Sequence, residues 1–157
     1  MHYYFNDEIT AETVNDLVSK LETSEKISLW FSTNGGDTNA MEFLISFFNS
    51  VAENLEITLT QTLCSSGTMI LEDFKGKINI YDLDYCLFHL ADRETYNLRN
   101  NSSKDKKVIA EQDRLYNLKT AEKIKKKNLL TEKQLKDFLD GKDVYVYQEQ
   151  MKTWKLD

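Results

Sequence analysis

The stretch Ile57-Thr58-Leu59-Thr60-Gln61-Thr62-Leu63-Cys64-Ser65-Ser66-Gly67 decides the fold of this chain, together with Asn34-Gly35-Gly36 about thirty residues before it. The two glycines likewise follow a strand-like apolar run, Ile27-Ser28-Leu29-Trp30-Phe31. In both places the strand is followed at once by a helix signal. Such a turn, with glycine where backbones come close, presents amide N–H groups to an anion. A serine there can act as an acyl-transfer nucleophile, because the helix N-terminus favours negative charge beside it.

Length and composition limit the classes of protein to consider. With 157 residues, 41% hydrophobic and 29% charged, the chain is typical of one globular domain. Its first residues lack the basic and apolar stretches of a secretory signal, and no window approaches the roughly 18 apolar residues of a membrane span. Cys64 and Cys86 are the only cysteines. We therefore expect a cytoplasmic protein with free thiols.

Charge is unevenly distributed along the sequence. Residues 1–100 hold 16 acids and 6 bases, a balance of −10, whereas residues 101–157 hold 10 acids and 14 bases, a balance of +4. The lysines of the second part cluster between 104 and 127, but Glu111, Asp113 and Glu122 interrupt them. This mixture favours the solvated face of a helix over a nucleic-acid interface.

Strand and helix signals alternate along the chain, which predicts an α/β layered domain. Expected strands cover 3–5, 27–32, 57–63, 78–81, 85–89 and 143–147. Expected helices cover 10–21, 39–51, 66–71, 104–128, a segment from the Thr131 capping box to Gly141, and 148–154. The apolar residues of helix 39–51 cover more than one face, which predicts a sandwiched helix. Those of helix 104–128 are sparse, which predicts that it projects from the core or packs on a partner. Residues 92–103 are polar and loop-like.

Serine acyl transfer needs a base, an acid that orients the base, and N–H donors for the oxyanion. The chain has two histidines, and His2 lies at a terminus, so His89 is the candidate base. His89 ends the strand-like run Tyr85-Cys86-Leu87-Phe88, which places it at a strand edge. Taken singly, His89 is typical of a structural histidine and Ser65 of a helix cap.

The order of these elements resembles the proteolytic subunit of the Clp protease, the ClpP family. Asn34-Gly35-Gly36-Asp37 stands where that family has a Pro-Gly-Gly turn, and residues 64–71 are similar to its nucleophile segment. The spacing from Gly36 to Ser65 aligns without a gap, and that from Ser65 to His89 aligns with about one residue deleted. Residues 3–10 resemble the family's opening strand. Residues 143–151, ending in Trp154-Lys155-Leu156, resemble the segment that carries its catalytic aspartate.

The resemblance implies a ClpP/crotonase-like α/β fold of stacked β-β-α units in a single domain. Its head would comprise 1–91 and 143–157, and its handle, about 92–142, would include a projecting helix. It implies a serine endopeptidase acting on peptides or unfolded proteins, with Ser65 as nucleophile, His89 as base and Asp143 orienting His89. The N–H groups of Gly36 and Ser66 would form the oxyanion hole, with no metal and no cofactor. In the family, the handle joins two rings and helps to order the triad.

Several segments depart from the family pattern. Leu90-Ala91 follows His89 where the family usually has Gln-Pro, and residues 92–103 lack the glycine-rich substrate-binding strand. The chain begins at the first strand, without the segment that forms the family's axial pore loops. The resemblance implies a homo-oligomeric ring, a heptamer or double ring, and a Clp-type ATPase partner. Given the missing axial segment, we expect self-standing assembly without a tight ATPase partner, and no membrane or nucleic-acid partner.

Other interpretations of the same residues remain open at the level of sequence. The chain could be a catalytically silent ring or binding protein, or a crotonase-like protein that binds acyl groups at the two N–H donors. Ser66-Gly67 could hold the nucleophile of a serine–lysine enzyme, although the spacing from Gly36 favours Ser65. Cys64 could be a thiol nucleophile. Cys86-x-x-His89 has metal-ligand spacing, but no second Cys/His pair exists to complete a zinc site.

Overall fold

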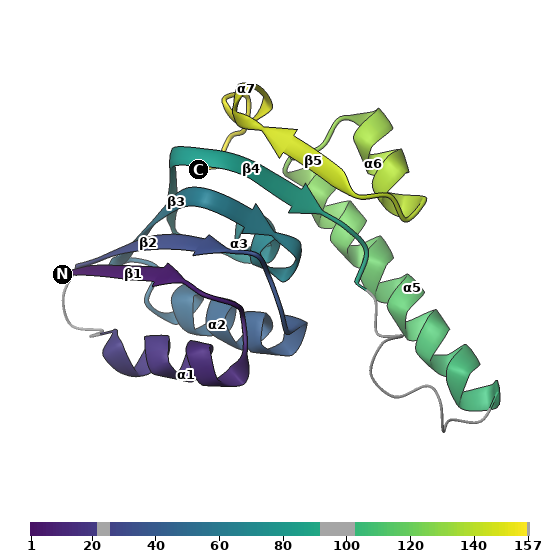
Figure 1. Cartoon of the computed structure of the whole chain (residues 1–157), viewed down its shortest axis with the longest axis horizontal. Helices are drawn as coiled ribbons and strands as arrows, with labels where there is room; N and C mark the ends of the chain where they lie inside the picture. Colours follow the sequence, from purple (N-terminus) through teal and green to yellow (C-terminus); the bar gives the residue numbers. More distant parts are fainter. Residues whose placement is uncertain (22–25, 92–102, 157) are drawn as a thin grey trace.

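Strands and helices alternate along the computed structural model, which describes residues 1–21, 26–91 and 103–156 (Figure 1). Its elements are β1 (His2–Asn6), α1 (Ala11–Lys20), β2 (Ile27–Thr33), α2 (Thr38–Ser50), β3 (Leu55–Cys64), the short 3-10 turn η1 (Ser65–Thr68), α3 (Met69–Asp73), β4 (Lys77–Phe88), α5 (Ser103–Lys126), α6 (Glu132–Leu139), β5 (Val144–Tyr147) and α7 (Gln148–Met151). The predicted α/β class is therefore confirmed. Most of the predicted loop 92–103, and with it the start of the predicted handle, lies outside the described residues. None of the described helices is long and apolar enough to cross a membrane.

The five strands form one sheet in the order β1-β2-β3-β4-β5. The first four are parallel, and β5 runs antiparallel to β4. Because neighbouring parallel strands end at the same edge, the residues after β2, β3 and β4 come together there. The Gly35-Gly36 turn, Ser65 and His89 are those residues. The parallel topology thus gathers three segments that are far apart in the sequence.

Side-chain caps fix where the helices begin and end. The Thr10 hydroxyl accepts from the Thr13 amide at 3.1 Å and starts α1. Asp37 caps α2, and Thr131 opens α6 in a capping box with Gln134, as predicted. Gly141, at φ +80°, lies in the left-handed conformation that ends α6.

The predicted strands 78–81 and 85–89 are wrong as separate elements, because β4 runs unbroken from Lys77 to Phe88. The polar residues between them form an irregularity within one strand. Asp82 adopts φ 51°, and Gln61 of β3, which pairs with the next residue Leu83, adopts φ 55°. The register of the two strands shifts at this point. β4 carries the extra residues of this bulge relative to β3, and the pairing then resumes and continues to the Cys64–Leu87 pair.

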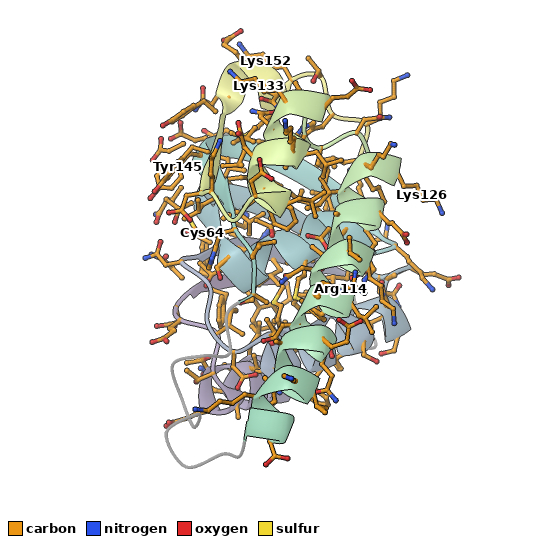
Figure 2. All side chains as sticks on the ribbon, turned by 90° about the vertical axis from the view of Figure 1, so that its right-hand side faces the viewer. Cys64, Arg114, Lys126, Lys133, Tyr145 and Lys152 are labelled. Atoms are coloured by element: carbon orange, nitrogen blue, oxygen red, sulfur yellow. The ribbon has the colours of Figure 1, made fainter. Side chains whose placement is uncertain are left out.

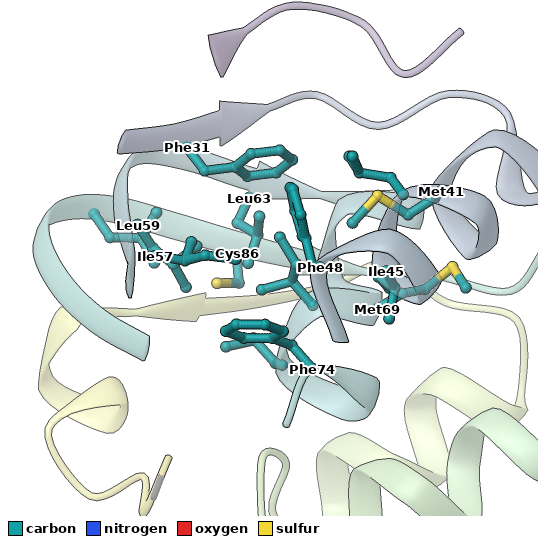
Figure 3. Close-up of a cluster of buried hydrophobic side chains, with 14 of the residues drawn as sticks. Phe31, Met41, Ile45, Phe48, Ile57, Leu59, Leu63, Met69, Phe74 and Cys86 are labelled. Carbon is teal, nitrogen blue, oxygen red and sulfur yellow. The ribbon is translucent and has the colours of Figure 1, made fainter. Parts of the chain in front are cut away.

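A single apolar core joins the sheet to the helices packed against it. Figure 3 shows its centre, where the Phe48 ring stands between Phe31 and Phe74 at centroid distances of 6.4 and 6.1 Å. The prediction that this helix, α2, is sandwiched is wrong. It buries one face through Met41, Leu44, Ile45 and Phe48, while Phe43 on another face is 52% exposed.

The two halves of helix α5 lie in different environments. Its C-terminal half packs on the core through Ala121 and Ile124, both buried. Its N-terminal half extends away from the sheet (Figure 1), where Val108 is 51% exposed, and Leu115 at the middle of the helix is 47% exposed. Figure 2 shows the same helix from the side, with Arg114 near its middle and Lys126 close to its end beside α6. The predicted projection of this helix thus holds for the N-terminal half alone.

Candidate active site

Ser65 begins the turn that follows β3, in an uncommon backbone conformation. Its φ is 54°, a left-handed value that costs a residue with a Cβ atom roughly 1–3 kcal/mol. The Thr68 hydroxyl donates to the Ser65 carbonyl at 2.8 Å and holds the turn. Strain of this kind persists where surrounding contacts impose it, and it is frequent at sites of chemistry.

His89 follows the last residue of β4 and reaches Ser65 directly. Its Nε2 lies 2.7 Å from Ser65 Oγ, which is a short hydrogen-bond distance. The pairing of Cys64 with Leu87 sets this approach, because it places the ends of β3 and β4 side by side. For Nε2 to accept the serine proton, the imidazole must carry its own proton on Nδ1. The arrangement is that of a hydroxyl nucleophile with its general base.

The two glycines of the first turn lie against this pair. A Cβ atom on Gly35 would come within 2.5 Å of Ser65 Cβ and 2.8 Å of the Cys64 carbonyl oxygen. Gly35 also has φ +99°, a region that L side chains rarely adopt. The structure thus brings the two turns together at Ser65, and this close approach requires glycine at position 35.

Gly36 and Ser66 are the predicted oxyanion donors. The Ile9 amide donates to the Gly35 carbonyl at 2.9 Å, and the Asp37 amide donates to the Ile9 carbonyl at 2.8 Å. These two bonds flank Gly36, so its own N–H takes no part in this pairing. Ser66 lies in the first turn of η1, where amides have no partner within the helix. The N–H groups of Gly36 and Ser66 therefore take no part in these bonds. Their role as oxyanion donors stays a prediction.

Asp143 lies near His89 in register but is not bonded to it. Val144 pairs with Phe88 across β4 and β5, so Asp143 and His89 flank the same pair of residues. Asp143 is exposed, and the hydrogen bonds found among the described residues do not join it to His89. The single chain therefore brings together Ser65 and His89, while the predicted third member stays apart.

A cavity opens beside the serine and histidine. Its volume is about 40 Å³, and it is partly open to solvent, between α3, the end of β4 and the packed half of α5. Ser65, His89, Glu72, Asn117 and Phe138 are among the side chains that line it. Of these five, Ser65 and His89 are predicted from the sequence, whereas Glu72, Asn117 and Phe138 are not.

Glu72 carries the strongest electrostatic perturbation at this site. It is 7% exposed, and its pKa is raised from 4.5 to about 8, mainly by burial and also by Asp73, against the opposing effect of Lys123. Lys123 is itself paired with Asp73 at 2.6 Å. The signal in the sequence was the first of two acids, Glu72 and Asp73, after Met69-Ile70-Leu71, one helical turn along from Met69.

Asn117 connects α5 to the strand end that carries His89. Its Oδ1 accepts from the Ala91 amide at 3.0 Å, and its Nδ2 donates to the Ala91 carbonyl at 3.5 Å. Asn117 is buried, so both bonds are shielded from water. A displacement of α5 would therefore move the backbone two residues beyond His89.

The rival nucleophiles and the metal site find little support in this geometry. The Ser66 hydroxyl is buried and has no hydrogen-bond partner among the described residues. Burial raises the pKa of the Cys64 thiol, which disfavours the reactive thiolate. Cys86 lies in the apolar core (Figure 3), while His89 bonds Ser65. Within the described ranges, no cluster of three or more potential metal ligands occurs.

Comparison with known proteins does not assign this chain to a family. The sequence matches no protein-family model and has no significant match among curated proteins.

Proposed function

We propose that this protein is a ClpP-like serine endopeptidase that cleaves peptides or unfolded chains. The observation that carries the proposal is the 2.7 Å contact between Ser65 Oγ and His89 Nε2 at the meeting point of the two predicted turns. The strained Ser65 backbone, the close approach of Gly35 and the adjoining cavity support it.

In the proposed reaction, Ser65 Oγ attacks the carbonyl carbon of the scissile bond while His89 Nε2 takes the hydroxyl proton. The negative charge that develops on the carbonyl oxygen is stabilised by the N–H groups of Gly36 and Ser66. His89 then gives its proton to the leaving amine, and the C–N bond breaks. Water attacks the resulting ester by the same route, releases the second product and restores Ser65.

Activity in this proposal depends on assembly into a homo-oligomeric ring. Asp143 is the proposed partner for His89 Nδ1, yet it is exposed and unbonded to His89 in the single chain. Helix α5 is the proposed contact between rings or subunits, since Val108, Leu115 and Leu118 are exposed along it. Because Asn117 ties α5 to Ala91, contacts made by α5 can act on His89. No tight ATPase partner is proposed.

A catalytically silent ring or binding protein is the second candidate. The separation of Asp143 from His89 favours it, because a histidine without an acid partner is a weaker general base. The two candidates differ in whether Ser65 is chemically reactive.

Labelling with a fluorophosphonate or β-lactone probe separates these candidates. We expect wild type to be labelled, Ser65→Ala to lose labelling, and Ser19→Ala, which removes an exposed hydroxyl on α1, to keep it. Loss of labelling in Ser66→Ala but not in Ser65→Ala would assign the nucleophile to Ser66. Turnover of an unfolded substrate should fall by several orders of magnitude in Ser65→Ala. An unlabelled, assembled wild type would favour the silent protein.

A further inference from the structure

The buried carboxyl group of Glu72 has no assigned role in the proposed reaction. Glu72 lies in α3 and lines the same cavity as Ser65 and His89. Its Oε1 atom is buried, and it has no hydrogen-bond partner among the described residues. Buried polar atoms are normally bonded, and leaving one unpaired costs about 1–3 kcal/mol. An unpaired acid inside a cavity next to a nucleophile therefore points to a ligand that completes its bonding.

The walls of the cavity define the shape of that ligand. Met69, Ile124 and Phe138 supply apolar surface, and Glu72 lies among them with Asn117. Asn117 is already bonded to the Ala91 backbone, so Glu72 Oε1 and Ser66 Oγ are the buried atoms without a partner among the described residues that line the cavity, and Glu72 is the acidic one. An unbranched side chain with an apolar stem and a polar end matches these surroundings.

The charge state of Glu72 defines the polar end. Its pKa of about 8 keeps the carboxyl group largely protonated at neutral pH, so it offers one O–H donor and one carbonyl acceptor. A carboxamide complements both atoms. An ammonium group instead donates to the carboxylate and favours its ionisation. Both ligand groups supply N–H donors to the unpaired oxygen, whereas an apolar end leaves it unsatisfied.

We propose that this cavity is the subsite for the side chain of the substrate residue that supplies the scissile carbonyl carbon. In this proposal, Glu72 selects side chains that end in N–H donors, namely glutamine or lysine. The inference rests on the proposed function and goes further by naming the substrate class. Glu72 acts on specificity: it contacts the substrate side chain and takes no part in proton transfer at Ser65.

Three matched peptides test the preference. They differ only at the residue that supplies the carbonyl carbon, which is glutamine, lysine or norleucine. We expect wild type to cleave the glutamine or lysine peptide about tenfold or more faster than the norleucine peptide, measured as kcat/KM. Equal rates for all three, or faster cleavage of the norleucine peptide, would overturn the proposal.

Two substitutions assign the preference to Glu72. Glu72→Leu should bring the three rates close together. Glu72→Gln supplies an amide that can pair with glutamine but cannot ionise to pair with an ammonium group, so it should keep a glutamine preference and abolish a lysine preference. The control is Glu42→Leu, which alters an exposed glutamate on α2 and should leave the ratios unchanged. A preference that survives in Glu72→Leu would contradict the role of this residue.

A binding measurement separates failure of this inference from failure of the proposed function. The Nα-acetyl amides of glutamine, lysine and norleucine are titrated into Ser65→Ala, and binding is followed by NMR chemical shifts. Selective binding that is lost on adding Glu72→Leu, in a protein that cleaves nothing, would support the subsite and reject the peptidase. Cleavage of all three peptides without selective binding would support the peptidase and reject the subsite.

Discussion

At the scale of single residues, the backbone of Ser65 is the most informative feature. Its side chain contacts His89 while its φ of 54° imposes a conformational cost. That cost is maintained by the strand before it and by the Thr68 hydroxyl after it. The proposed reactivity and the local strain thus reside in the same residue.

A pair of substitutions measures this strain. Ser65→Ala and Ser65→Gly both remove the hydroxyl, but glycine adopts positive φ without a Cβ penalty. We expect the glycine variant to be the more stable of the two by about 1 kcal/mol, measured by urea unfolding. The same pair at Ser19, inside α1, should give the opposite order, since glycine destabilises a right-handed helix by about 1 kcal/mol. Equal stabilities at position 65 would show that the turn is unstrained.

Glu72 should make stability depend on pH. Its pKa is about 8 in the folded chain against an ordinary value of 4.5, so between these values the folded state holds a proton that the unfolded state releases. The free energy of unfolding therefore falls as pH rises through this window, by up to about 1.4 kcal/mol per pH unit, and the loss is complete above about pH 8. Below pH 4.5 Glu72 is protonated in both the folded and the unfolded state, so it no longer makes the free energy of unfolding depend on pH. The groups that face this carboxyl are Asp73 and Lys123, with His89 and Tyr116 in the cavity.

Comparison with Glu72→Gln isolates this term, because glutamine does not titrate. Relative to wild type, the variant should gain stability steadily from pH 5 to pH 8, as measured by urea unfolding at each pH. Stability curves that stay parallel across this range would mean that Glu72 is ionised in the folded protein.

At the scale of elements, α5 links the surface to the candidate site. Its N-terminal half is exposed, and its C-terminal half carries Asn117, which holds Ala91 at the strand end beside His89. One rigid helix thus spans from the outer surface to the strand that supplies the proposed base.

Removing this link should affect reactivity more than folding. We expect Asn117→Ala to lower the rate of Ser65 labelling about ten- to a hundredfold, because small displacements of a catalytic group are costly. Asn79→Ala, which removes a bond to Glu56 at the other end of β4, is the control. Both variants are compared at temperatures where circular dichroism finds them fully folded, so that lost stability does not enter. Equal labelling rates would assign Asn117 a structural role only.

At the scale of the whole molecule, charge and exposed apolar residues point to assembly. Residues 1–100 have a net charge of −10, and residues 101–157 have a net charge of +4. The acidic segment of one copy can therefore attract the basic segment of another. Exposed charge pairs are screened over about 8–10 Å at moderate ionic strength. We expect light scattering at micromolar concentration to give an oligomer at low salt that weakens as salt rises, with Ser65 labelling falling in parallel. A mass near 18.4 kDa at low salt would contradict the assembly.

The contact made by α5 is tested by placing a charge on it. Leu115→Asp should dissociate the oligomer, because it buries an unpaired carboxylate in the interface, and labelling should fall with it. Leu139→Asp changes a similarly exposed leucine on α6 and is the matched control; Leu115 and Leu139 are 47% and 42% exposed. An unchanged mass in Leu115→Asp would place the interface elsewhere.

The sequence by itself determined the alternation of strands and helices, the caps at Thr10 and Thr131, and the two turns that meet at Ser65. These depend on local periodicity, on hydrogen bonds within a few residues, and on glycines whose conformation few other residues adopt. The parallel order of the strands then brings the turns together, since such strands end at one edge.

Only the tertiary structure decided the features that depend on neighbours distant in sequence. β4 is continuous because it keeps pairing with β3 on both sides of its bulge, which no window around Asp82 reveals. Phe43 is exposed because the core covers one face of α2, although apolar residues occupy more than one. The raised pKa of Glu72 follows from burial beneath α5, because a carboxyl group has an ordinary pKa until the surrounding chain removes its water.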